Sequence, residues 1–439
     1  MCRIATIICV IFSVMTTGLA SDKMAPERRP FRSCLGVSCH FAQGMPLSAM
    51  DWLADIGATW VRDECPWSSV EPRRGEYRVP DRARQWIDEA ARRGLKIILH
   101  LGYSNEAYEN PWDPDAYARY AAFLADALKD KVQAYHCVNE PHNFGFMQYY
   151  GGQWNGAGDS PWIEKYAELV RKAAAAVHQV APDIPVMPDE DVYVNHYRFL
   201  DAGLGPYVYA LSIHPYTHSS IPPEVTQWAH PTPMDDPYQV ADEDGSFVSV
   251  LRRLRQYAQQ KTGRQFELWA TEWGYPVPDW VDEETAAGYL VRMYVVSFAS
   301  SVRVVCWHNL QDWGDGPFGL VDNEGNKRLT YFAYKQMAQT LGPLRLLRQV
   351  RGQHNPIRGV HAYLFGGGEQ RVLALWNVDN QPQAMELRGL RSATQVLDIL
   401  GHRRPLHIAG GRAEIAISGQ PCYVVGVTEH AAVRPLRAQ

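Results

Sequence analysis

Residues 80–103 read "PDRARQWIDEAARRGLKIILHLGY", a helix pattern followed directly by a strand pattern. In residues 80–94 the apolar side chains recur at helical spacing, and Gly94 is a typical helix stop. Residues 95–103 then form a short apolar run, which is typical of a buried strand. The number of times that the chain repeats this helix and strand pattern therefore decides which fold the sequence predicts.

Short apolar or β-branched runs of this kind occur eight times before residue 311. They are "LGVSCHF" (35–41), "TWVRDE" (59–64), "LKIILHLGY" (95–103), "VQAYHCVNE" (132–140), "IPVMPDE" (184–190), "YALSIHPY" (209–216), "FELWATEWG" (266–274) and "VRVVCWHNL" (302–310). Further helix patterns precede the fourth, fifth and seventh runs, at residues 114–131, 160–182 and 246–263. Eight alternations predict an α/β fold with a (β/α)8 barrel, because a doubly wound sheet rarely needs that many.

The pattern changes near residue 345, after a last helix pattern at residues 329–344. Short alternating runs follow: "VHAYLFG", "RVLALWNV", "AMELRGL", "ATQVLDIL", "RAEIAIS" and "CYVVGV". Turn residues such as "GGGEQ" and "VDNQPQ" separate them. We predict a barrel catalytic domain at residues 21–344 and a small antiparallel β-sandwich at residues 345–439.

The first twenty residues, "MCRIATIICVIFSVMTTGLA", have the features of a cleaved secretion signal. Arg3 supplies the positive region, residues 4–17 the apolar region, and Gly18 and Ala20 the small residues at the cleavage site. The apolar region is shorter than the 18 or more residues typical of a membrane span. We predict a signal peptide at residues 1–20, a secreted or periplasmic protein, and no membrane span in the mature chain.

The charge pattern argues against a nucleic-acid partner. The formal net charge is -5, and acidic and basic residues are well mixed along the chain without a basic run. The aromatic content is unusual, with 14 Trp and 23 Tyr. An excess of flat side chains suits a protein that packs against sugar rings, so a carbohydrate is the expected partner. The sequence leaves the oligomeric state open.

The cysteines leave disulfide pairing open and do not predict a metal site. Six cysteines follow the predicted signal, and they are Cys34, Cys39, Cys65, Cys137, Cys306 and Cys422. They are scattered, and most lie in apolar strand-like runs, where Cys serves as a small buried hydrophobe. No pair has the spacing of a zinc site, so we expect no metal and no cofactor.

Barrel enzymes build their sites at the C-terminal ends of the strands. The side chains expected there are His40, Arg62, His100, Asn139, Glu140, His214, Tyr216, Glu272, Trp307 and His308. Two of them are carboxylates: Glu140 ends the fourth strand and Glu272 ends the seventh. Strands four and seven lie across a barrel mouth from each other, so these glutamates are expected to flank one bond of a substrate.

Two carboxyl groups about 5 to 5.5 Å apart form the arrangement that cleaves glycosidic bonds with retention of configuration. In this interpretation Glu272 is the ionised nucleophile, and Glu140 is first the proton donor and then the base for water. Arg62 and Tyr216 are expected to hold Glu272 ionised through hydrogen bonds. Asn139 is expected to bind the sugar 2-hydroxyl.

The remaining predicted substrate-binding residues are His100, His214, Trp273 and Trp307, with Trp307 as the floor under the sugar. His214 has a second interpretation, in which it orients a neighbouring side chain. Further tryptophans fall on loops at the same face, and about half of them are expected to contact sugar; they are Trp67, Trp112, Trp154 and Trp313.

Several of these motifs together resemble a known group of enzymes. "VNEP", "HPY", "TEWG" and a Trp at the end of strand eight are similar to the clan A retaining glycoside hydrolases. Within that clan, "RDECPWSSVEPRRGEY" and "WHNLQDWGDGPFGLVDNEGNKRLTYFAY" resemble glycoside hydrolase family 39 and its exopolysaccharide-cleaving relatives. The resemblance covers residues 34–342. It implies that Glu140 is the acid/base and Glu272 the nucleophile. It also implies that the innermost sugar subsite is lined by Arg62, Asn139, His214, Tyr216 and Trp307.

Alternatives remain at the level of substrate and class. The long aromatic loops after strands four and six favour endo action on a bacterial exopolysaccharide or similar polymer. An exo-acting β-xylosidase-like or α-L-iduronidase-like enzyme could use the same loops as pocket walls. A non-catalytic sugar-binding protein would keep the aromatic residues but would have little reason to keep both glutamates. A metal-dependent barrel hydrolase would need a His-x-His pair on the first strand, where "SCHFA" offers one histidine.

Overall fold

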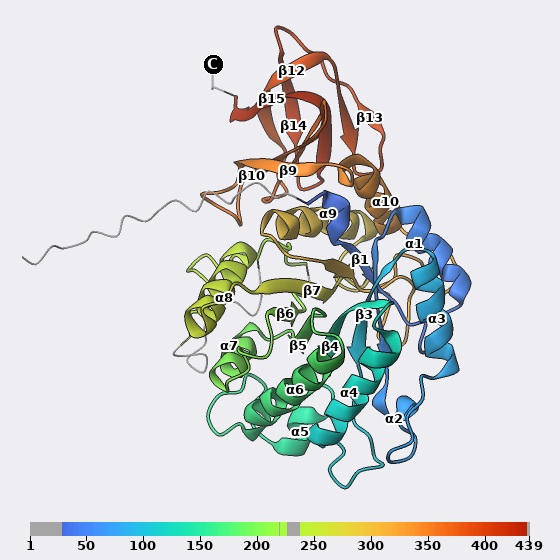
Figure 1. The fold of residues 1–439 in the computed structure, drawn as a ribbon. Coiled ribbons are helices and arrows are strands. Elements are labelled where there is room, and N and C mark those ends of the chain that lie inside the picture. Colours follow the sequence, from blue (N-terminus) through green and yellow to red (C-terminus); the bar gives the residue numbers. More distant parts are fainter. Residues whose placement is uncertain (1–28, 219, 226–237, 437–439) are drawn as a thin grey trace, which may run out of the picture.

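The computed structural model describes residues 29–218, 220–225 and 238–436. Figure 1 shows a barrel ringed by helices, with a smaller sheet packed at one side of it. The predicted secretion signal at residues 1–20 lies outside the described residues. None of the described helices is both long enough and apolar enough to cross a membrane.

Eight parallel strands close the barrel, and each pairs with its neighbours in chain order. They are β1 (Leu35–Ser38), β2 (Trp60–Cys65), β3 (Lys96–Leu101), β4 (Val132–Cys137), β5 (Val186–Glu190), β6 (Ala210–Ile213), β7 (Glu267–Trp273) and β8 (Val305–Trp307). All eight predicted strands are present, and the prediction of a (β/α)8 barrel is confirmed.

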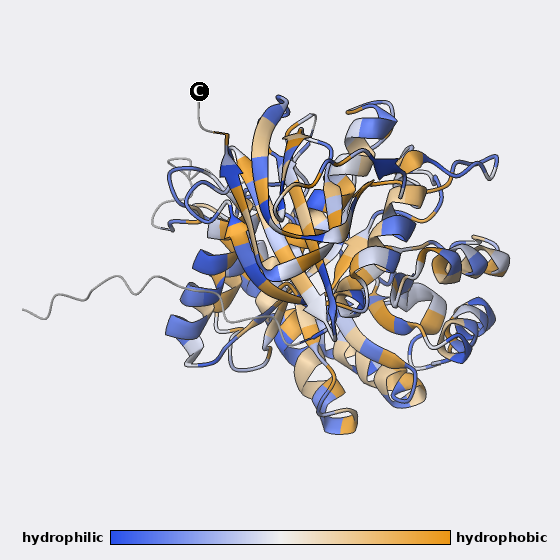
Figure 2. Ribbon diagram, turned by 90° about the horizontal axis from the view of Figure 1, so that it is seen from above, coloured by the Kyte–Doolittle hydropathy of each residue, from blue (hydrophilic) through white to orange (hydrophobic). Residues whose placement is uncertain are grey.

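Helices surround the barrel and connect its strands. The α-helices are α1 (Met50–Ile56), α2 (Trp67–Val70), α3 (Asp81–Arg92), α4 (Pro114–Leu128), α5 (Phe146–Tyr150), α6 (Pro161–Val180), α7 (Tyr193–Asp201), α8 (Phe247–Thr262), α9 (Glu283–Ala299) and α10 (Leu329–Leu341). Two short 3-10 helices are η1 (Phe31–Cys34) and η2 (Leu47–Ala49). Figure 2 shows hydrophobic residues in the strands and on the inner faces of the helices, and hydrophilic ones outside.

Capping residues explain where the long helices begin. The Asp113 side chain accepts a hydrogen bond from the Ala116 N–H, and Pro114 occupies the first turn of α4. Ser246 caps α8 in the same way, through the N–H of Ser249. These signals lie in the sequence itself, which is why the helix patterns at residues 114–131 and 246–263 matched the observed helices closely.

The C-terminal part is an antiparallel sheet of seven strands with its own hydrophobic core, as expected for a β-sandwich. Its strands are β9 (Arg345–Arg351), β10 (Val360–Gly367), β11 (Gln370–Asn377), β12 (Gln383–Asp398), β13 (Arg403–Arg404), β14 (Arg412–Ile417) and β15 (Cys422–Pro435). Strand β9 was not predicted. The runs "AMELRGL" and "ATQVLDIL" form one strand, β12, whose pairing with β15 shifts register on both sides of Leu390. Gly389 takes a positive φ of 76° there, so the chain turns without ending the strand.

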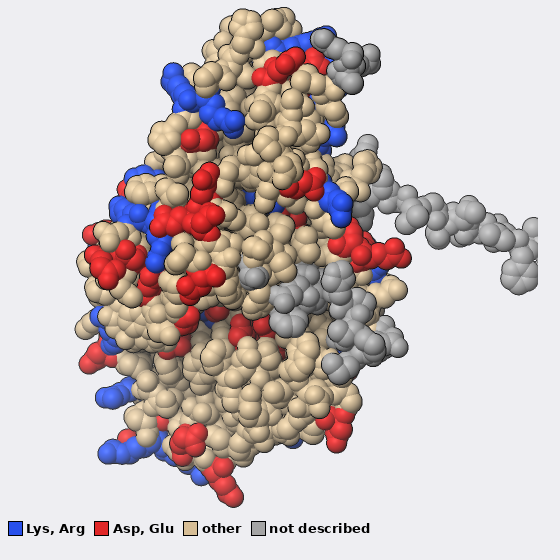
Figure 3. Space-filling view, turned by 180° about the vertical axis from the view of Figure 1, so that it is seen from behind, with Lys and Arg blue, Asp and Glu red and all other residues tan. Residues whose placement is uncertain are grey.

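The described cysteines and surface charges agree with the sequence. In the described part of the chain Cys34, Cys39, Cys65, Cys137, Cys306 and Cys422 are all buried as small core residues and form no disulfide with one another. On the face of the molecule in Figure 3, lysines and arginines are interspersed with acidic side chains.

Candidate active site

The inside of the barrel changes from apolar to polar along the strands. Near the start of the strands the interior is a buried apolar cluster that includes Trp60, Ile98, Ala134, Met187, Ala210 and Trp269. Successive residues of a strand face opposite sides, so the residue two positions further on returns to the interior. Those residues are Arg62, His100, His136, Asp189, Ser212 and Thr271. The site is therefore built on a layer of buried polar side chains over an apolar base.

Glu272 lies in β7 and is held by two hydrogen-bond donors. Arg62 Nη1 lies 2.7 Å from Glu272 Oε2, and the Tyr216 hydroxyl donates to Oε1 at 2.9 Å. Burial alone would raise the pKa of Glu272, but the charges of His308, His214 and Arg62 and the Tyr216 hydrogen bond hold it well below its usual range. Glu272 is thus an ionised carboxylate aimed into the barrel mouth, as the sequence predicted for a nucleophile.

A local irregularity of β7 points Glu272 inward. The pairing of β7 with β8 shifts register between Ala270 and Trp273. Thr271 contacts the buried Ser212 and His214, and the next residue, Glu272, contacts Arg62, so two successive side chains face the interior. A regular strand would send one of them outward. The irregularity thus brings the carboxylate into the site.

Glu140 follows β4 on a strained piece of backbone. Val138 and Glu140 have φ values of 35° and 39°, a left-handed region that costs a non-glycine residue on the order of 1–3 kcal/mol. His214 Nδ1 lies 2.7 Å from Glu140 Oε1, and the Asn143 amide donates to Oε2 at 2.9 Å. Both oxygens therefore have partners, and Oε2, which faces a neutral amide, is the oxygen best placed to carry a transferable proton.

His214 connects Glu140 to a buried aspartate. Its Nε2 lies 3.1 Å from Asp189 Oδ1, and both side chains are fully buried. Burial would lower the pKa of His214, but the charges of Asp189 and Glu272 raise it well above its usual value. A charged His214 can donate to Asp189 and Glu140 at once. The ring of His214 is completely enclosed, so its contacts are those of a residue that orients a neighbouring side chain.

The two glutamates face each other closely. Carboxylate oxygens of Glu140 and Glu272, and a ring nitrogen of His214, all lie within 4.8 Å of one another. Carboxyl groups of retaining glycosidases lie about 5 to 5.5 Å apart, whereas those of inverting enzymes lie about 6.5 to 9.5 Å apart to admit a water molecule. The close approach in this site is nearer to the spacing of retaining enzymes than to the wider spacing of inverting ones, and it fits direct attack by one carboxylate.

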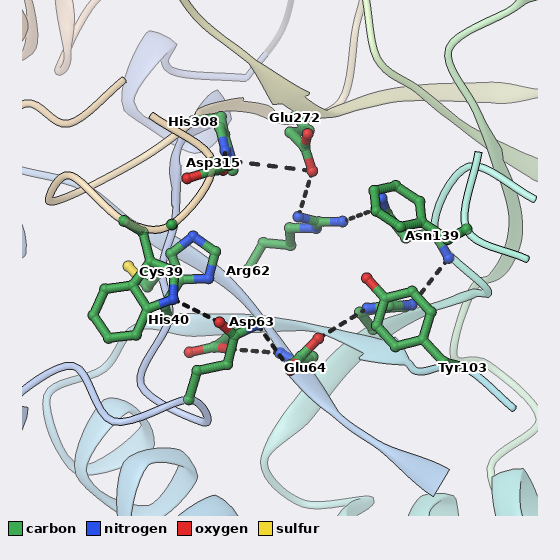
Figure 4. Close-up of a pocket in the computed structure, with 15 residues that line it drawn as sticks. Cys39, His40, Arg62, Asp63, Glu64, Tyr103, Asn139, Glu272, His308 and Asp315 are labelled. Atoms are coloured by element: carbon green, nitrogen blue, oxygen red, sulfur yellow. Dashed lines mark hydrogen bonds and ion pairs between the residues drawn. The ribbon is translucent and has the colours of Figure 1, made fainter. Parts of the chain in front are cut away.

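Glu272 borders a cavity of about 400 Å³. The other residues that line it are Cys39, His40, Gln43, Arg62, Asp63, Glu64, His100, Tyr103, Asn139, Phe144, His308, Trp313, Gly314 and Asp315. Figure 4 shows Glu272, His308 and Asp315 on one side of this cavity and Glu64 on the other, with Arg62 between them. The lining comes from β2, β3 and β7 and from the loops after β1, β3, β4 and β8.

Four of the predicted site residues line this cavity, namely Arg62, His100, Asn139 and Glu272, and Glu140, His214 and Tyr216 join them through direct contacts beside it. Arg62 Nη2 donates to Asn139 Oδ1, and the Asn139 backbone N–H donates to His100 Nε2 at 3.0 Å. The structure thus brings together Arg62, His100, Asn139, Glu140, His214, Tyr216 and Glu272.

The expectation for Trp307 and Trp273 does not match the structure. Both are fully buried, and neither lines the cavity. The Trp307 indole N–H donates to the Phe318 carbonyl at 3.0 Å, and the ring packs edge-on against Trp273 with centroids 5.0 Å apart. His308, the next residue, lines the cavity instead. Of the other four tryptophans, Trp313 lines it, whereas Trp67 and Trp112 are buried in the core.

Sequence reasoning did not assign a role to Gln43, Glu64, Tyr103, Phe144 and Asp315, all of which line the cavity. For Glu64 a signal was present, because it follows Arg62 by two residues and period-two alternation places both on one face. Tyr103, at the end of "LKIILHLGY", had a similar signal. Gln43, Phe144 and Asp315 lie on loops, where no periodic pattern indicates direction.

Three groups of histidines and carboxylates come close enough to hold a metal ion, but hydrogen bonds already join their members. The groups are His40, His308 and Asp315; Glu140, His214 and Glu272; and His142, Glu190 and Asp191. His308 pairs with Asp315, His214 with Glu140, and His142 Nδ1 lies 2.7 Å from Glu190 Oε1. These contacts join two members of each group, while Glu190 Oε2, Asp191 Oδ1 and His308 Nδ1 are buried without a hydrogen-bond partner among the described residues.

Comparison with known proteins finds other proteins with the fold of this chain. No family model matches the chain, and no curated protein matches its sequence. Solved structures match it over most of its length. A family 39 glycoside hydrolase from Bacteroides cellulosilyticus WH2 has 20% identity and a TM-score of 0.73, over 91% of this chain and 81% of that one.

Two other solved structures give the same result. A monomeric β-xylosidase from Caulobacter crescentus CB15 has 14% identity and a TM-score of 0.60, over 95% of this chain and 99% of that one. A family 30 endoxylanase from Clostridium papyrosolvens C71 has 13% identity and a TM-score of 0.57, over 92% and 98%. The chain therefore has the fold of family 39 and family 30 glycoside hydrolases, as the resemblance of its motifs implied.

Proposed function

We propose that this protein is a retaining glycoside hydrolase that cleaves O-glycosidic bonds by double displacement. The observation that carries the proposal is the approach of the Glu140 and Glu272 carboxylates to within 4.8 Å, with Glu272 held by Arg62 and Tyr216. The fold shared with glycoside hydrolases supports the same reaction class.

In the first step Glu272 attacks the anomeric carbon, and Glu140 donates its proton to the departing oxygen. Arg62 and Tyr216 keep Glu272 ionised before the attack. When the ester forms, the charge on Glu272 disappears. Glu140, now ionised and held by His214 and Asn143, takes a proton from water, which then hydrolyses the ester.

We further propose endo action on a polysaccharide chain outside the cytoplasm. The segment that follows Glu140 exposes Phe144 on a loop and Tyr149 in α5, which are 47% and 49% accessible. Phe144 also lines the cavity, so aromatic faces continue from the cavity onto the surface. Such faces suit the stacking of successive sugar rings. The predicted secretion signal supports an extracellular or periplasmic polymer, such as a bacterial exopolysaccharide.

The test combines a substrate panel with two variants of the carboxylates. We expect the purified protein to release oligosaccharides from at least one bacterial or plant polysaccharide and to form product with the anomeric configuration of the substrate, as followed by NMR. Glu272→Gly should abolish cleavage, and azide should rescue it to give a glycosyl azide of inverted configuration. Glu140→Ala should keep the glycosylation of substrates with good leaving groups, and azide should then give the retained configuration.

An inverted first product would contradict the double displacement. Release of single sugars alone would replace endo action by exo action and leave the reaction class intact. Binding of a polysaccharide without any cleavage would favour the non-catalytic sugar-binding interpretation. Glu76→Gln provides the control variant, because Glu76 is an exposed glutamate whose side chain forms an ion pair with Arg73.

A further inference from the structure

The wall of the cavity opposite Glu272 carries a second carboxylate that the reaction does not use. Glu64 lies in β2, two residues after Arg62, and its side chain is 12% accessible. The Gln43 amide donates to Oε1 at 3.0 Å, and His100 Nδ1 lies 3.7 Å from Oε2. These contacts fix the carboxylate and leave each of its oxygens free to accept another hydrogen bond.

The neighbouring Asp63 does not present its charge to the cavity in this way. Its Oδ2 accepts hydrogen bonds from the Phe41 and Ala42 N–H groups, at 2.5 and 3.3 Å, and its Oδ1 accepts one from the Glu64 N–H. Burial and the charge of Glu64 raise the pKa of Asp63 well above its usual value. The pKa of Glu64 is lowered, because hydrogen bonding to His100 and Gln43 outweighs its burial. Of Asp63 and Glu64, Glu64 is therefore the carboxylate that would face a bound ligand.

The cavity has little positive charge left for an anionic ligand. Among the described residues that line it, Arg62 is the one arginine and none is a lysine. The three donor nitrogens of Arg62 already bond to His136, Glu272 and Asn139. Each Nη of Arg62 keeps a second N–H, but its charge is already paired with Glu272, so a ligand carboxylate would meet two facing carboxylates and little unpaired positive charge.

The histidines of the cavity either are neutral or already face a carboxylate of the protein. Burial lowers the pKa of His40 to about 4, so this ring is neutral. His100 accepts the Asn139 N–H and faces Glu64. His308 bonds to Asp315 through Nε2 and lies 4.0 Å from Glu272 through Nδ1. Asp315 adds a third carboxylate, whose side chain is 39% accessible.

We propose that Glu64 is a specificity-determining residue which accepts hydroxyl hydrogens of the bound sugar, and that the cavity takes uncharged sugars and rejects uronic acids. Sugar hydroxyls donate to a carboxylate in charge-assisted hydrogen bonds, which are stronger than neutral ones. A uronate would place a like charge between Glu64, Glu272 and Asp315, and unpaired like charges are disfavoured in a partly buried site. This inference rests on the proposed function for its biological meaning, and its test is a binding measurement.

The experiment uses monosaccharide pairs that differ only in a C6 carboxylate: glucose and glucuronate, galactose and galacturonate, mannose and mannuronate. Their dissociation constants are measured at neutral pH by NMR titration with the native protein, Glu64→Gln and the surface control Glu76→Gln. The native protein and the control are expected to bind the neutral member of at least one pair at least ten-fold more tightly than its uronate. Glu64→Gln should weaken neutral binding by about ten-fold, the value of one hydrogen bond to a charged group, and should narrow the difference within the pair.

Equal or tighter binding of uronates by the native protein would overturn the inference, and so would a Glu64→Gln variant that behaves like Glu76→Gln. Binding of no sugar in any pair would also overturn it. Circular dichroism and a thermal melt of each variant establish that the barrel is folded. The two proposals can fail separately: a protein that binds neutral sugars through Glu64 but cleaves no glycoside loses the hydrolase function alone. One that cleaves glycosides but prefers uronates loses this inference alone.

Discussion

The hydroxyl of Tyr216 donates to Glu272 Oε1 at 2.9 Å, so its removal should change the pH profile of the enzyme directly. Burial and the negative charges of Glu272 and Glu140 raise the pKa of Tyr216 well above its usual value, so it stays a hydroxyl donor. Its hydrogen bond is one of the contributions that lower the pKa of Glu272. A lowered pKa keeps a carboxylate ionised to more acidic pH.

Tyr216→Phe is expected to move the acidic limb of kcat/KM to higher pH by about one unit, since a hydrogen bond to a charged group contributes on the order of 1.5–3 kcal/mol. The measurement is the pH dependence of kcat/KM on an aryl glycoside, over the range in which circular dichroism shows a folded protein. Tyr209→Phe is the control, because Tyr209 lies just before β6 and its hydroxyl donates to the Asp183 carbonyl. An unchanged acidic limb in Tyr216→Phe would show that Tyr216 does not set the ionisation of Glu272.

At the scale of the element, the end of β8 shows what the sequence could not specify. Strand positions could be read because the strands are short apolar or β-branched runs, and the strand ends placed Arg62, Glu140 and Glu272 close together, as they are in the structure. To predict which way a side chain points, the register of its strand must be known to within one residue. On β8 that one residue separates the buried Trp307 from His308, which lines the cavity. On β7 the irregularity between Ala270 and Trp273 likewise has no periodic signal.

Two variants separate the roles of these adjacent residues. Trp307→Phe removes the donor to the Phe318 carbonyl and loosens the packing on Trp273, so it is expected to destabilise the fold by about 1–3 kcal/mol while kcat/KM changes little. His308→Ala is expected to lower kcat/KM at least ten-fold with a smaller change in stability. Thermal denaturation and steady-state kinetics of both variants are the measurements. Loss of activity in Trp307→Phe without loss of stability would restore the original assignment of Trp307 to the sugar site.

At the scale of the whole molecule, the C-terminal sheet supports the loop that carries Tyr216. Glu224, on the loop after β6, forms a buried bidentate ion pair with Arg292 of α9, at 2.9 and 2.7 Å. The Trp376 indole of β11 donates to the same Glu224 at 2.8 Å, and Arg292 Nη1 donates to Asn380 Oδ1 at 3.2 Å. Figure 1 shows α9 beside the C-terminal sheet. The two parts of the chain thus share one buried charge network close to the site loop.

Removal of one partner from this network should affect both parts together. Glu224→Gln leaves Arg292 buried without its counter-charge, which typically costs about 3–5 kcal/mol. Burial would raise the pKa of Glu224, but Arg292 lowers it, so Glu224 contributes stability above the ordinary carboxyl pKa and loses it as pH falls through the lowered value. The deficit of Glu224→Gln against the native protein should therefore be largest at neutral pH and shrink in acid. Thermal melts across this pH range test it, with Glu76→Gln as the surface control.

The same variant tests whether the C-terminal sheet matters for the site. Tyr216 and Glu224 lie on one loop, and the Tyr289 hydroxyl of α9 donates to the Ser220 carbonyl of that loop at 3.1 Å. If the network holds the loop in place, Glu224→Gln should lower kcat/KM at temperatures where the barrel is still folded, because Tyr216 then binds Glu272 less often. Addition of neutral sugar should recover part of the lost thermal stability, since a ligand that binds the native state stabilises it. A variant with native kcat/KM and a lowered melting temperature would limit the C-terminal sheet to a structural role.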